Sequence, residues 1–250
     1  MIKIDSVSLE IGGKTLVEDV NLTCHPGTVT ALVGPNGAGK SSLLSLIAGE
    51  RNVEQGEIWL NGRSIAKLSI REFAQERAIF PQGSEIRFNY PVKEIVAMSR
   101  AFRDLPPEED DAVISWAMDK TEIQHLAGRN AQTLSGGEKA RATYSRVLAQ
   151  ETKVLLLDEP IAALDLRHQE RVLQSAREQA CAGATVIAVL HDLNLAAAYS
   201  DQVALMQNGR LVSTGAPWDV LTENNISTVY QQDVCVLKHP VRECPVVLTR

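Results

Sequence analysis

The first part of the chain alternates apolar and polar residues, which is the pattern of a strand with one buried face. The alternation runs over residues 2–9 and over residues 15–23, on either side of Gly12-Gly13. A glycine pair between two such runs predicts a tight turn and therefore an antiparallel pair of strands. Residues 28–33 differ, because they form a continuous apolar, β-branched run that predicts a strand buried on both faces.

Apolar residues at helical spacing dominate two later parts of the chain, first residues 43–48 and then the stretch between residues 88 and 150. Residues 106–111 carry four acids and are interpreted as a linker between two helices. The helical sets are Leu43, Leu44, Ile47 and Ala48, which Gly49 would end as a C-cap; Val92, Ile95, Val96 and Met98; and Val113, Ile114, Trp116 and Ala117.

Strand-like runs return at residues 78–80, 154–157 and 184–190, and helical stretches lie between and after them. Strands that alternate with helices form a mostly parallel sheet with helices on both faces. The chain is therefore predicted to have an α/β fold, in which residues 88–150 are an inserted helical subdomain.

Composition and charge narrow the classes of function. Hydrophobic residues make up 44% and charged residues 22%, the balance of an ordinary globular protein. A net charge of −6 argues against nucleic acid as a partner, because proteins that bind its phosphate backbone carry a basic surplus.

The four cysteines form no Cys-x-x-Cys pair, so neither a zinc site nor a redox motif is predicted. We see no signal-peptide pattern and no apolar run of bilayer length, so any membrane role is expected to come through a partner.

Residues 34–41 form the pattern G-x-x-x-x-G-K-S between a predicted buried strand and a predicted helix. The glycines would let backbone N–H groups approach phosphate oxygens, and the helix N-terminus would add its positive end. Lys40 would supply charge to the outer phosphates, and the Ser41 hydroxyl would bind Mg²⁺. This context favours a phosphate loop over a glycine-rich turn before a core helix. The predicted nucleotide-binding residues are Gly34, Pro35, Asn36, Gly37, Ala38, Gly39, Lys40, Ser41 and Ser42.

The three later strand-like runs each end in polar side chains suited to phosphate chemistry. Because ligands bind at the carboxyl ends of parallel strands, these side chains are expected to converge on the loop at residues 34–41. They are Gln82, Asp158 with Glu159, and His191.

Hydrolysis of a γ-phosphate needs charge neutralisation and a positioned water. Asp158 fits the acid that holds Mg²⁺, and Glu159 fits the general base or water orienter. Alone, this carboxylate pair would equally fit an exposed turn, and the phosphate loop decides between the two interpretations. His191 is predicted to contact the γ-phosphate, while the next residue could also begin a helix as its N-cap.

Residues Leu134-Ser-Gly-Gly-Glu138 match the signature motif of the ATP-binding-cassette family, which the chain resembles. A serine–glycine turn that caps a helix would explain Ser135 and the glycines but not the whole set. The resemblance implies that Ser135, Gly136, Gly137 and Glu138 bind the γ-phosphate of an ATP molecule held by a second subunit.

The resemblance extends over nearly the whole chain. Residues 154–160 resemble the family's Walker B segment, Asp165 its D-loop acid and His191 its switch histidine. Gln82 resembles the Q-loop glutamine and would join Ser41 and Asp158 as a ligand of Mg²⁺.

The implied fold is a P-loop NTPase core of the RecA-like kind with an N-terminal antiparallel β subdomain and an inserted helical subdomain. Residues 1–250 would form a single domain. Within it, residues 1–87 and 151–220 would be the nucleotide-binding core with its β subdomain, residues 88–150 the helical subdomain with the signature motif, and residues 221–250 a C-terminal extension.

The resemblance also implies partners and cofactors. Two copies of the chain would sandwich two ATP molecules with Mg²⁺ and hydrolyse them to ADP and phosphate. This homodimer would lie at the cytoplasmic face of the cell membrane, bound to two transmembrane permease subunits. A substrate-binding protein, periplasmic or at the cell surface, would meet the complex through the permease.

Two positions depart from the family pattern. The family often stacks adenine on an aromatic residue before the phosphate loop, but the matching position is Ile11 and no aromatic residue occurs before Trp59. Adenine would then be held by apolar packing. Ala162 stands in the D-loop region where a serine is common, which would remove one polar contact across the dimer and leave Asp165.

Residues 80–100 and 191–197 and the His239-Pro240 tail resemble the ATPases of importers for iron–siderophores, cobalamin and haem, and most of all haemin. A ferric-siderophore or cobalamin importer remains the alternative, because the transported molecule does not touch this subunit in such systems. A single-cassette iron–sulfur assembly protein is a further alternative. A GTPase switch is disfavoured, since the guanine-reading motif N-K-x-D is absent.

Cys244-Pro245, near His239, has the form of a short haem-regulatory Cys–Pro pair. The alternative is that Pro240 and Pro245 simply end strands in the C-terminal extension.

The surface that meets a permease is expected between Gln82 and the helical subdomain, because aromatic and Met side chains there suit an interface. Core packing of the subdomain is the alternative for each of them. The candidates are Arg87, Phe88, Tyr90 and Met98.

Overall fold

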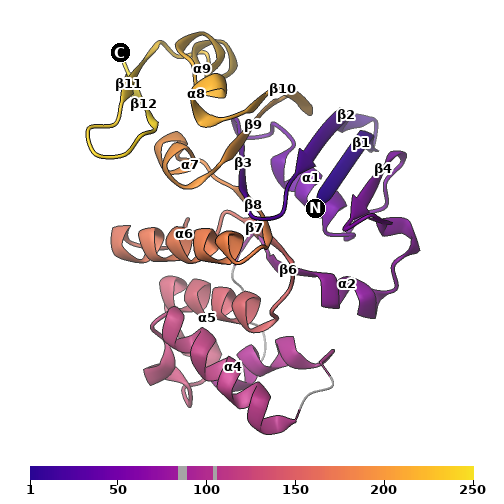
Figure 1. Cartoon of the computed structure of the whole chain (residues 1–250), viewed down its shortest axis with the longest axis vertical. Coiled ribbons are helices and arrows are strands. Elements are labelled where there is room, and N and C mark those ends of the chain that lie inside the picture. Colours follow the sequence, from indigo (N-terminus) through magenta and orange to yellow (C-terminus); the bar gives the residue numbers. More distant parts are fainter. Residues whose placement is uncertain (84–88, 104–105) are drawn as a thin grey trace.

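The computed structural model of the chain describes residues 1–83, 89–103 and 106–250. Within these ranges a six-stranded sheet lies at the centre, with a four-stranded antiparallel sheet and a two-stranded hairpin as separate sheets. In Figure 1 the helices drawn in magenta lie below the central sheet, and the indigo N-terminal sheet lies to its right. The α/β fold with an antiparallel N-terminal sheet is therefore confirmed.

The N-terminal sheet has the strand order β2-β1-β4-β5, and its first two strands pair across Gly12-Gly13 as the alternating pattern predicts. Their inward side chains are buried, whereas those between them face solvent. The strands are β1 (Ile2–Ile11), β2 (Lys14–Cys24), β4 (Gln55–Leu60) and β5 (Arg63–Ser64).

The central sheet has the strand order β10-β9-β3-β8-β7-β6. As far as the described residues show, its strands pair in parallel except for β9 and β10, which are antiparallel. Every residue of β3, β7 and β8 is buried, which explains their continuous apolar sequences. The strands are β3 (Val29–Val33), β6 (Arg77–Phe80), β7 (Val154–Asp158), β8 (Thr185–Val189), β9 (Gln202–Gln207) and β10 (Arg210–Gly215).

The helices fall into those that flank the central sheet and those between β6 and β7. The latter, α3, α4 and α5, pack on one another. The bounds are α1 (Lys40–Ile47), α2 (Ile70–Glu76), α3 (Val92–Ala97), α4 (Pro107–Lys120), α5 (Gly136–Ala149), α6 (Leu166–Cys181), α7 (Leu193–Tyr199), α8 (Pro217–Val220) and α9 (Glu223–Tyr230).

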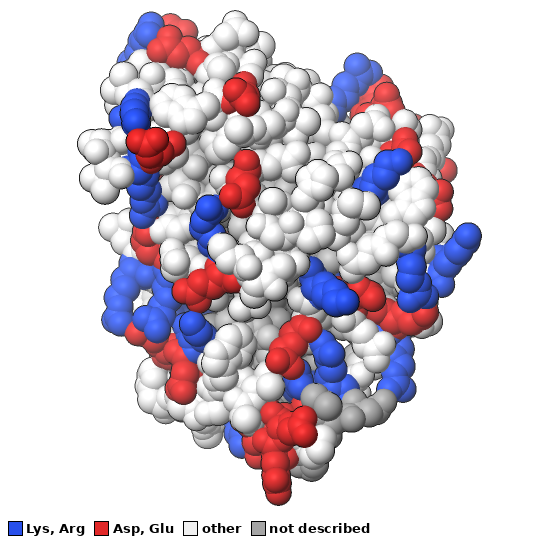
Figure 2. Space-filling view, in the orientation of Figure 1, with Lys and Arg blue, Asp and Glu red and all other residues white. Residues whose placement is uncertain are grey.

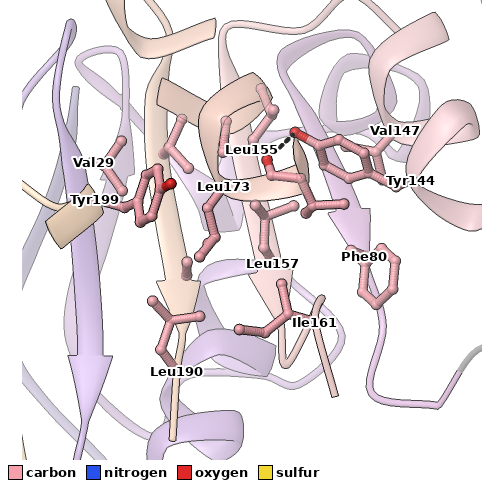
Figure 3. Close-up of a cluster of buried hydrophobic side chains, with 14 of the residues drawn as sticks. Val29, Phe80, Tyr144, Val147, Leu155, Leu157, Ile161, Leu173, Leu190 and Tyr199 are labelled. Atoms are coloured by element: carbon pink, nitrogen blue, oxygen red, sulfur yellow. Dashed lines mark hydrogen bonds between the residues drawn. The ribbon is translucent and has the colours of Figure 1, made fainter. Parts of the chain in front are cut away.

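Apolar side chains gather on both faces of the central sheet. Along β7, Leu155 and Leu157 belong to a cluster shared with the helical block, while Leu156 belongs to a cluster shared with α1 and the N-terminal sheet. Figure 3 shows the first cluster, where Leu155 and Leu157 lie near Tyr144 of α5. The Tyr144 hydroxyl donates to the carbonyl of Val172 on α6 at 3.3 Å, so the helical block and α6 share one packed interior.

The interpretation of residues 106–111 as a linker is wrong, because α4 begins at Pro107. Proline suits the first position of a helix, and Glu108, Glu109 and Asp110 lie in the first turn, where they interact favourably with the positive end of the helix dipole. On the face drawn in Figure 2, acidic and basic side chains are interspersed, and acids gather at the bottom of the view by the start of α4.

The end of the chain contains strands that the sequence pattern did not predict, namely β9, β10 and the hairpin β11 (Val234–Lys238) and β12 (Pro245–Thr249). Pro245 begins a strand rather than ending one. Cys244 is buried in the main core, and Nδ1 of His239 accepts from the backbone N–H groups of Val241 and Arg242. These contacts give Cys244 and His239 structural roles in the C-terminal extension, and a haem-regulatory role for Cys244-Pro245 stays a prediction.

Among the described residues, no helix is both long enough and apolar enough to cross a lipid bilayer.

Candidate functional site

The phosphate-loop pattern lies where β3 ends and α1 begins, as predicted. Gly34 and Gly39 have φ angles of 147° and 98°, which disfavour residues with a Cβ atom. A Cβ at Gly34 would overlap the carbonyl oxygen of Met206 on β9, and one at Gly39 would overlap that of Leu16 on β2. The loop is therefore wedged between the central sheet and the N-terminal sheet, which fixes its shape.

Lys40 begins α1 and folds back over the loop. Its Nζ donates to the carbonyl oxygens of Gly34 at 2.7 Å and of Pro35 at 2.9 Å. Burial lowers the pKa of the ammonium group, while the negative charges of Glu159 and Asp158 act in the opposite direction. A desolvated cation held by two carbonyls is placed to bind an anion, because an anion would restore part of the solvation that the ammonium has lost.

Asp158 ends β7, and its Oδ1 accepts a hydrogen bond from the Ser41 hydroxyl at 3.1 Å. Burial raises the pKa of the Asp158 carboxyl, so its ionised form lacks adequate compensation within the chain. A cation beside it would supply that compensation. The carboxylate and the hydroxyl are hard oxygen ligands of the kind that Mg²⁺ takes when it keeps water and phosphate as its remaining ligands. The described residues hold no cluster of three or more His, Cys, Asp or Glu side chains that could hold a metal ion.

Glu159, which follows β7, contacts side chains that follow two other strands of the central sheet. Its Oε1 lies 2.7 Å from Nε2 of His191, which follows β8, and accepts from Nε2 of Gln82, which follows β6, at 3.1 Å. Glu159 also has a φ of 52°, a left-handed conformation that costs energy in a residue with a Cβ and recurs at functional sites. Asp192 caps α7 through the N–H groups of Asn194 and Leu195, which sets the start of that helix directly after His191.

A cavity of about 460 Å³ joins these groups to the phosphate loop. Lys14 and Leu16 of β2 form part of its wall, and motif reasoning missed both. The turn Gly12-Gly13 offered a signal, because it places Lys14 opposite Ile11 at one end of the hairpin. The other lining residues are Asn36, Gly37, Ala38, Gly39, Lys40, Ser41, Ser42, Gln82, Glu159 and His191.

The signature segment does not line this cavity. Ser135 caps α5 and shares a capping box with Glu138: the Ser135 N–H donates to Oε2 of Glu138 at 2.7 Å, and the Glu138 N–H donates to the Ser135 hydroxyl at 3.3 Å. Ser135 and Gly136 are exposed. Asp165 is likewise exposed and caps α6 through the N–H of His168 at 3.0 Å. The structure therefore gathers the phosphate-loop residues in one place, while Ser135, Gly136 and Asp165 face solvent elsewhere and Gly137 and Glu138 are half-buried.

A phosphate loop with a buried carboxylate, a second acid and a histidine at the ends of parallel strands defines a P-loop nucleotide hydrolase. The family model described as ABC transporter matches residues 17–162, and the chain belongs to that family as one of its ATPases.

The relatives and solved structures that the chain matches are of the same kind. The hemin import ATP-binding protein HmuV of Thermobifida fusca is 45% identical over 97% of this chain and 86% of its own length. The protein of the same name from Streptomyces coelicolor is 46% identical over 93% of this chain and 84% of its own. An inward-facing transporter described as of metal-chelate type has a chain with a TM-score of 0.84 at 26% identity, covering 100% of this chain and 96% of that one.

Proposed function

We propose that this chain is the ATP-hydrolysing subunit of a bacterial importer for haem. The observation that carries this proposal is the 45% identity over 97% of the chain to a hemin import ATP-binding protein. The likeness to a transporter described as of metal-chelate type fits haem, which is an iron chelate, and it also keeps a ferric-siderophore or cobalamin importer as the second candidate.

The site residues divide the chemistry of hydrolysis between them. Gly34 to Ser42 would hold the phosphates of ATP, and Lys40 would neutralise the outer ones. Glu159 would accept a proton from the water that attacks the γ-phosphorus, so that ADP leaves with the electrons of the broken P–O bond. His191, 2.7 Å from Glu159, would orient that carboxylate and reach the γ-phosphate.

Ser41 and Asp158 would hold Mg²⁺, and Gln82 would join them by turning from Glu159 toward the metal. When bound, Mg²⁺ offsets the negative charge that develops on the phosphate oxygens.

We also propose that two copies of the chain act as a head-to-tail dimer. Ser135, Gly136, Gly137, Glu138 and Asp165 would complete the nucleotide site of the second copy, which explains why they lie outside the cavity of their own chain. Leu166, next to Asp165, leaves 80% of its surface exposed. A large apolar side chain beside a polar motif suits a surface that a partner covers.

The permease would meet the chain at the cytoplasmic face of the membrane, next to Gln82 and α3. Tyr90 and Met98 are 44% and 43% exposed and remain candidate contacts. Arg87 and Phe88 lie outside the described residues. A substrate-binding protein outside the cell membrane would deliver haem to the permease.

Transport by the reconstituted complex tests the proposal. The chain and its permease are placed in liposomes, and ATP-dependent uptake of radiolabelled haem, a ferric siderophore and cobalamin is compared. Uptake of haem alone supports the proposal, and preferential uptake of either other molecule replaces haem by that cargo. Stable ATPase activity with no permease partner in cell extracts would favour a role outside transport.

A further inference from the structure

Glu122 lies in the turn that follows α4 and leads toward the signature segment. Its φ of 54° is left-handed, so the backbone there is strained unless surrounding contacts hold it. Its carbonyl oxygen accepts from Nη1 of Arg141 on α5 at 2.9 Å, and the same nitrogen lies 3.3 Å from the carbonyl oxygen of Thr121. The backbone of this turn is thus fixed to the helix that begins at the signature motif.

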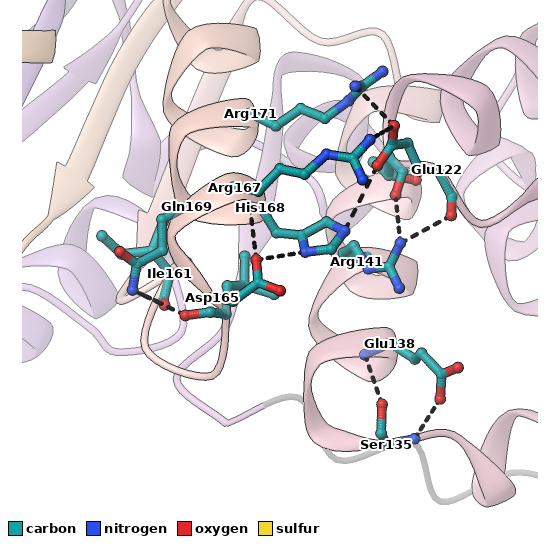
Figure 4. A network of polar contacts seen from close by, with 12 residues as sticks. Glu122, Ser135, Glu138, Arg141, Ile161, Asp165, Arg167, His168, Gln169 and Arg171 are labelled. Atoms are coloured by element: carbon teal, nitrogen blue, oxygen red, sulfur yellow. Dashed lines mark hydrogen bonds and ion pairs between the residues drawn. The ribbon is translucent and has the colours of Figure 1, made fainter.

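The Glu122 carboxylate faces the opposite direction, toward α6 (Figure 4). Its Oε1 accepts from Nη2 of Arg167 at 2.6 Å and from Nη1 of Arg171 at 2.9 Å. The side chain is only 27% exposed, so these ion pairs are partly shielded from water. One residue therefore joins α5 to the first two turns of α6.

His168 connects Glu122 to Asp165, the acid of the D-loop (residues 160–165). Its Nε2 lies 3.6 Å from Oε2 of Glu122, and its Nδ1 lies 2.7 Å from Oδ1 of Asp165. The backbone N–H of His168 also donates to Oδ1 of Asp165 at 3.0 Å, and this hydrogen bond, followed by the one from the His168 ring, lowers the pKa of the Asp165 carboxyl. Asp165 is thereby held in one orientation at the start of α6.

The signature helix and the D-loop also touch directly. A Cβ at Gly137 would lie 3.3 Å from the carbonyl oxygen of Ala163, so the first turn of α5 packs closely on the segment before Asp165. Glu122 itself lies in the wall of an open cavity of about 570 Å³, which is also lined by Asp119, Gln124, His125, Arg141, Arg167, His168 and Arg171. Glu122 is the acid in this group that pairs with Arg167 and Arg171, so its loss would leave neighbouring cations to repel one another.

We propose that Glu122 is a positioning residue for ATP hydrolysis, which fixes Asp165 relative to the signature residues Ser135 to Glu138 so that both reach the second copy of the chain in one arrangement. This inference rests on the proposed dimer. Glu122 lies outside the nucleotide cavity, and it acts through Arg141 on one side and through Arg167, Arg171 and His168 on the other.

The test compares Glu122→Gln with Glu178→Gln in the full chain. Glu178 pairs with Lys120 at 3.1 Å and so also joins the end of α4 to α6, but it lies on the later part of α6, away from Asp165. Glu122→Gln should lower kcat about three- to thirtyfold with KM for ATP nearly unchanged, because coupling residues shift such equilibria without touching ligand. Glu178→Gln should leave both constants as in the unchanged chain.

A double-variant cycle with Asp165→Asn separates positioning from general loss of stability. If Glu122 acts through Asp165, the double variant should lose no more activity than the worse single variant. Arg167→Gln, at a side chain that is 71% exposed, provides a milder variant with a smaller loss in the same direction. Equal kcat in Glu122→Gln and Glu178→Gln, or fully multiplicative losses in the cycle, would overturn the proposal.

Formation of an ATP-dependent dimer by Glu159→Gln is measured alongside. No dimer in that variant would remove the proposed function on which the inference rests. A dimer there, together with unchanged turnover in Glu122→Gln, would remove only the role of Glu122.

Discussion

Nε2 of His191 lies 2.7 Å from Oε1 of Glu159. The two residues come from the ends of neighbouring strands, β8 and β7, whose parallel pairing brings Asp158 opposite Val189. The contact therefore depends on the register of the sheet and not only on the loops that carry the two side chains. The contact limits the rotation of the Glu159 carboxylate. A general base needs such a fixed orientation, because it must take a proton from one positioned water molecule.

Glu159→Gln should abolish turnover while ATP binding is retained. Glutamine keeps the shape and the contacts of the side chain but cannot accept the proton, so kcat should fall by about a hundred- to ten-thousandfold. Phosphate release and fluorescent-ATP binding measure the two effects separately, with the exposed Glu57→Gln as the matched control. Near-normal hydrolysis by Glu159→Gln would show that another group is the base.

Lys40→Ala should weaken nucleotide binding rather than slow the chemical step. The ammonium provides charge-assisted contacts to the phosphates, whose loss should raise Kd for ATP about ten- to hundredfold. Isothermal titration of the full chain gives Kd directly, and Lys153→Ala, an exposed lysine next to β7, is the control. An unchanged Kd would mean that Lys40 remains on the Gly34 and Pro35 carbonyls when ATP binds.

Asp158→Asn should stabilise the protein in the absence of nucleotide. Burial raises the pKa of the carboxyl, so the folded protein holds this proton more tightly than the unfolded chain does. Its ionisation therefore costs stability above the raised pKa, and that cost disappears below the ordinary aspartate pKa of about 3.9.

Thermal melts of the two proteins at several pH values check this expectation. Asp158→Asn should have the higher Tm at pH 7.5, and the gain should shrink as the pH falls toward 4. The exposed Asp233→Asn should show no such trend. Adding ATP with Mg²⁺ should raise the Tm of the unchanged chain more than that of Asp158→Asn, because ligand binding stabilises only a folded state that can bind it. A gain that is independent of pH would contradict the role of burial.

Gly39→Ala should destabilise the fold more than Gly62→Ala. Both glycines have positive φ, 98° and 80°, so either substitution should cost about 1–2 kcal/mol in backbone strain. Only the Cβ at Gly39 would also overlap a backbone atom, the carbonyl oxygen of Leu16, whereas nothing lies within 4 Å of one at Gly62. Urea unfolding should therefore show a clearly larger loss for Gly39→Ala, and equal losses would mean that the loop can move away from β2.

The sequence predicts the elements whose periodicity reflects burial. The alternation around Gly12-Gly13 predicts β1 and β2, and the continuous apolar run before Asp158 predicts β7, because each pattern follows from how many faces of the strand are covered. The acids of residues 108–111 misled the interpretation, since charges at a helix start resemble those of an exposed linker.

The residues of the candidate site were likewise predictable from the sequence only in part. Gln82, Asp158, Glu159 and His191 could be predicted to converge, because parallel strands bring their carboxyl ends to one edge. Leu16 and Glu122 could not, since each reaches its place only through packing between distant segments. Neither residue belongs to a motif whose chemistry reveals it.

Gly34 packs closely on Met206 and Gly39 on Leu16. These contacts help to distinguish a catalytically inactive homologue from an active one. Gly34 is needed where the loop packs on β9 of the central sheet and Gly39 where it packs on β2 of the N-terminal sheet, whether or not ATP is ever cleaved. A duplicated gene that drifted away from catalysis would therefore still have to encode them. Glycines at these two positions therefore indicate only that the fold is intact. A loss of ATPase activity would instead be indicated by substitutions at Lys40, Asp158 and Glu159.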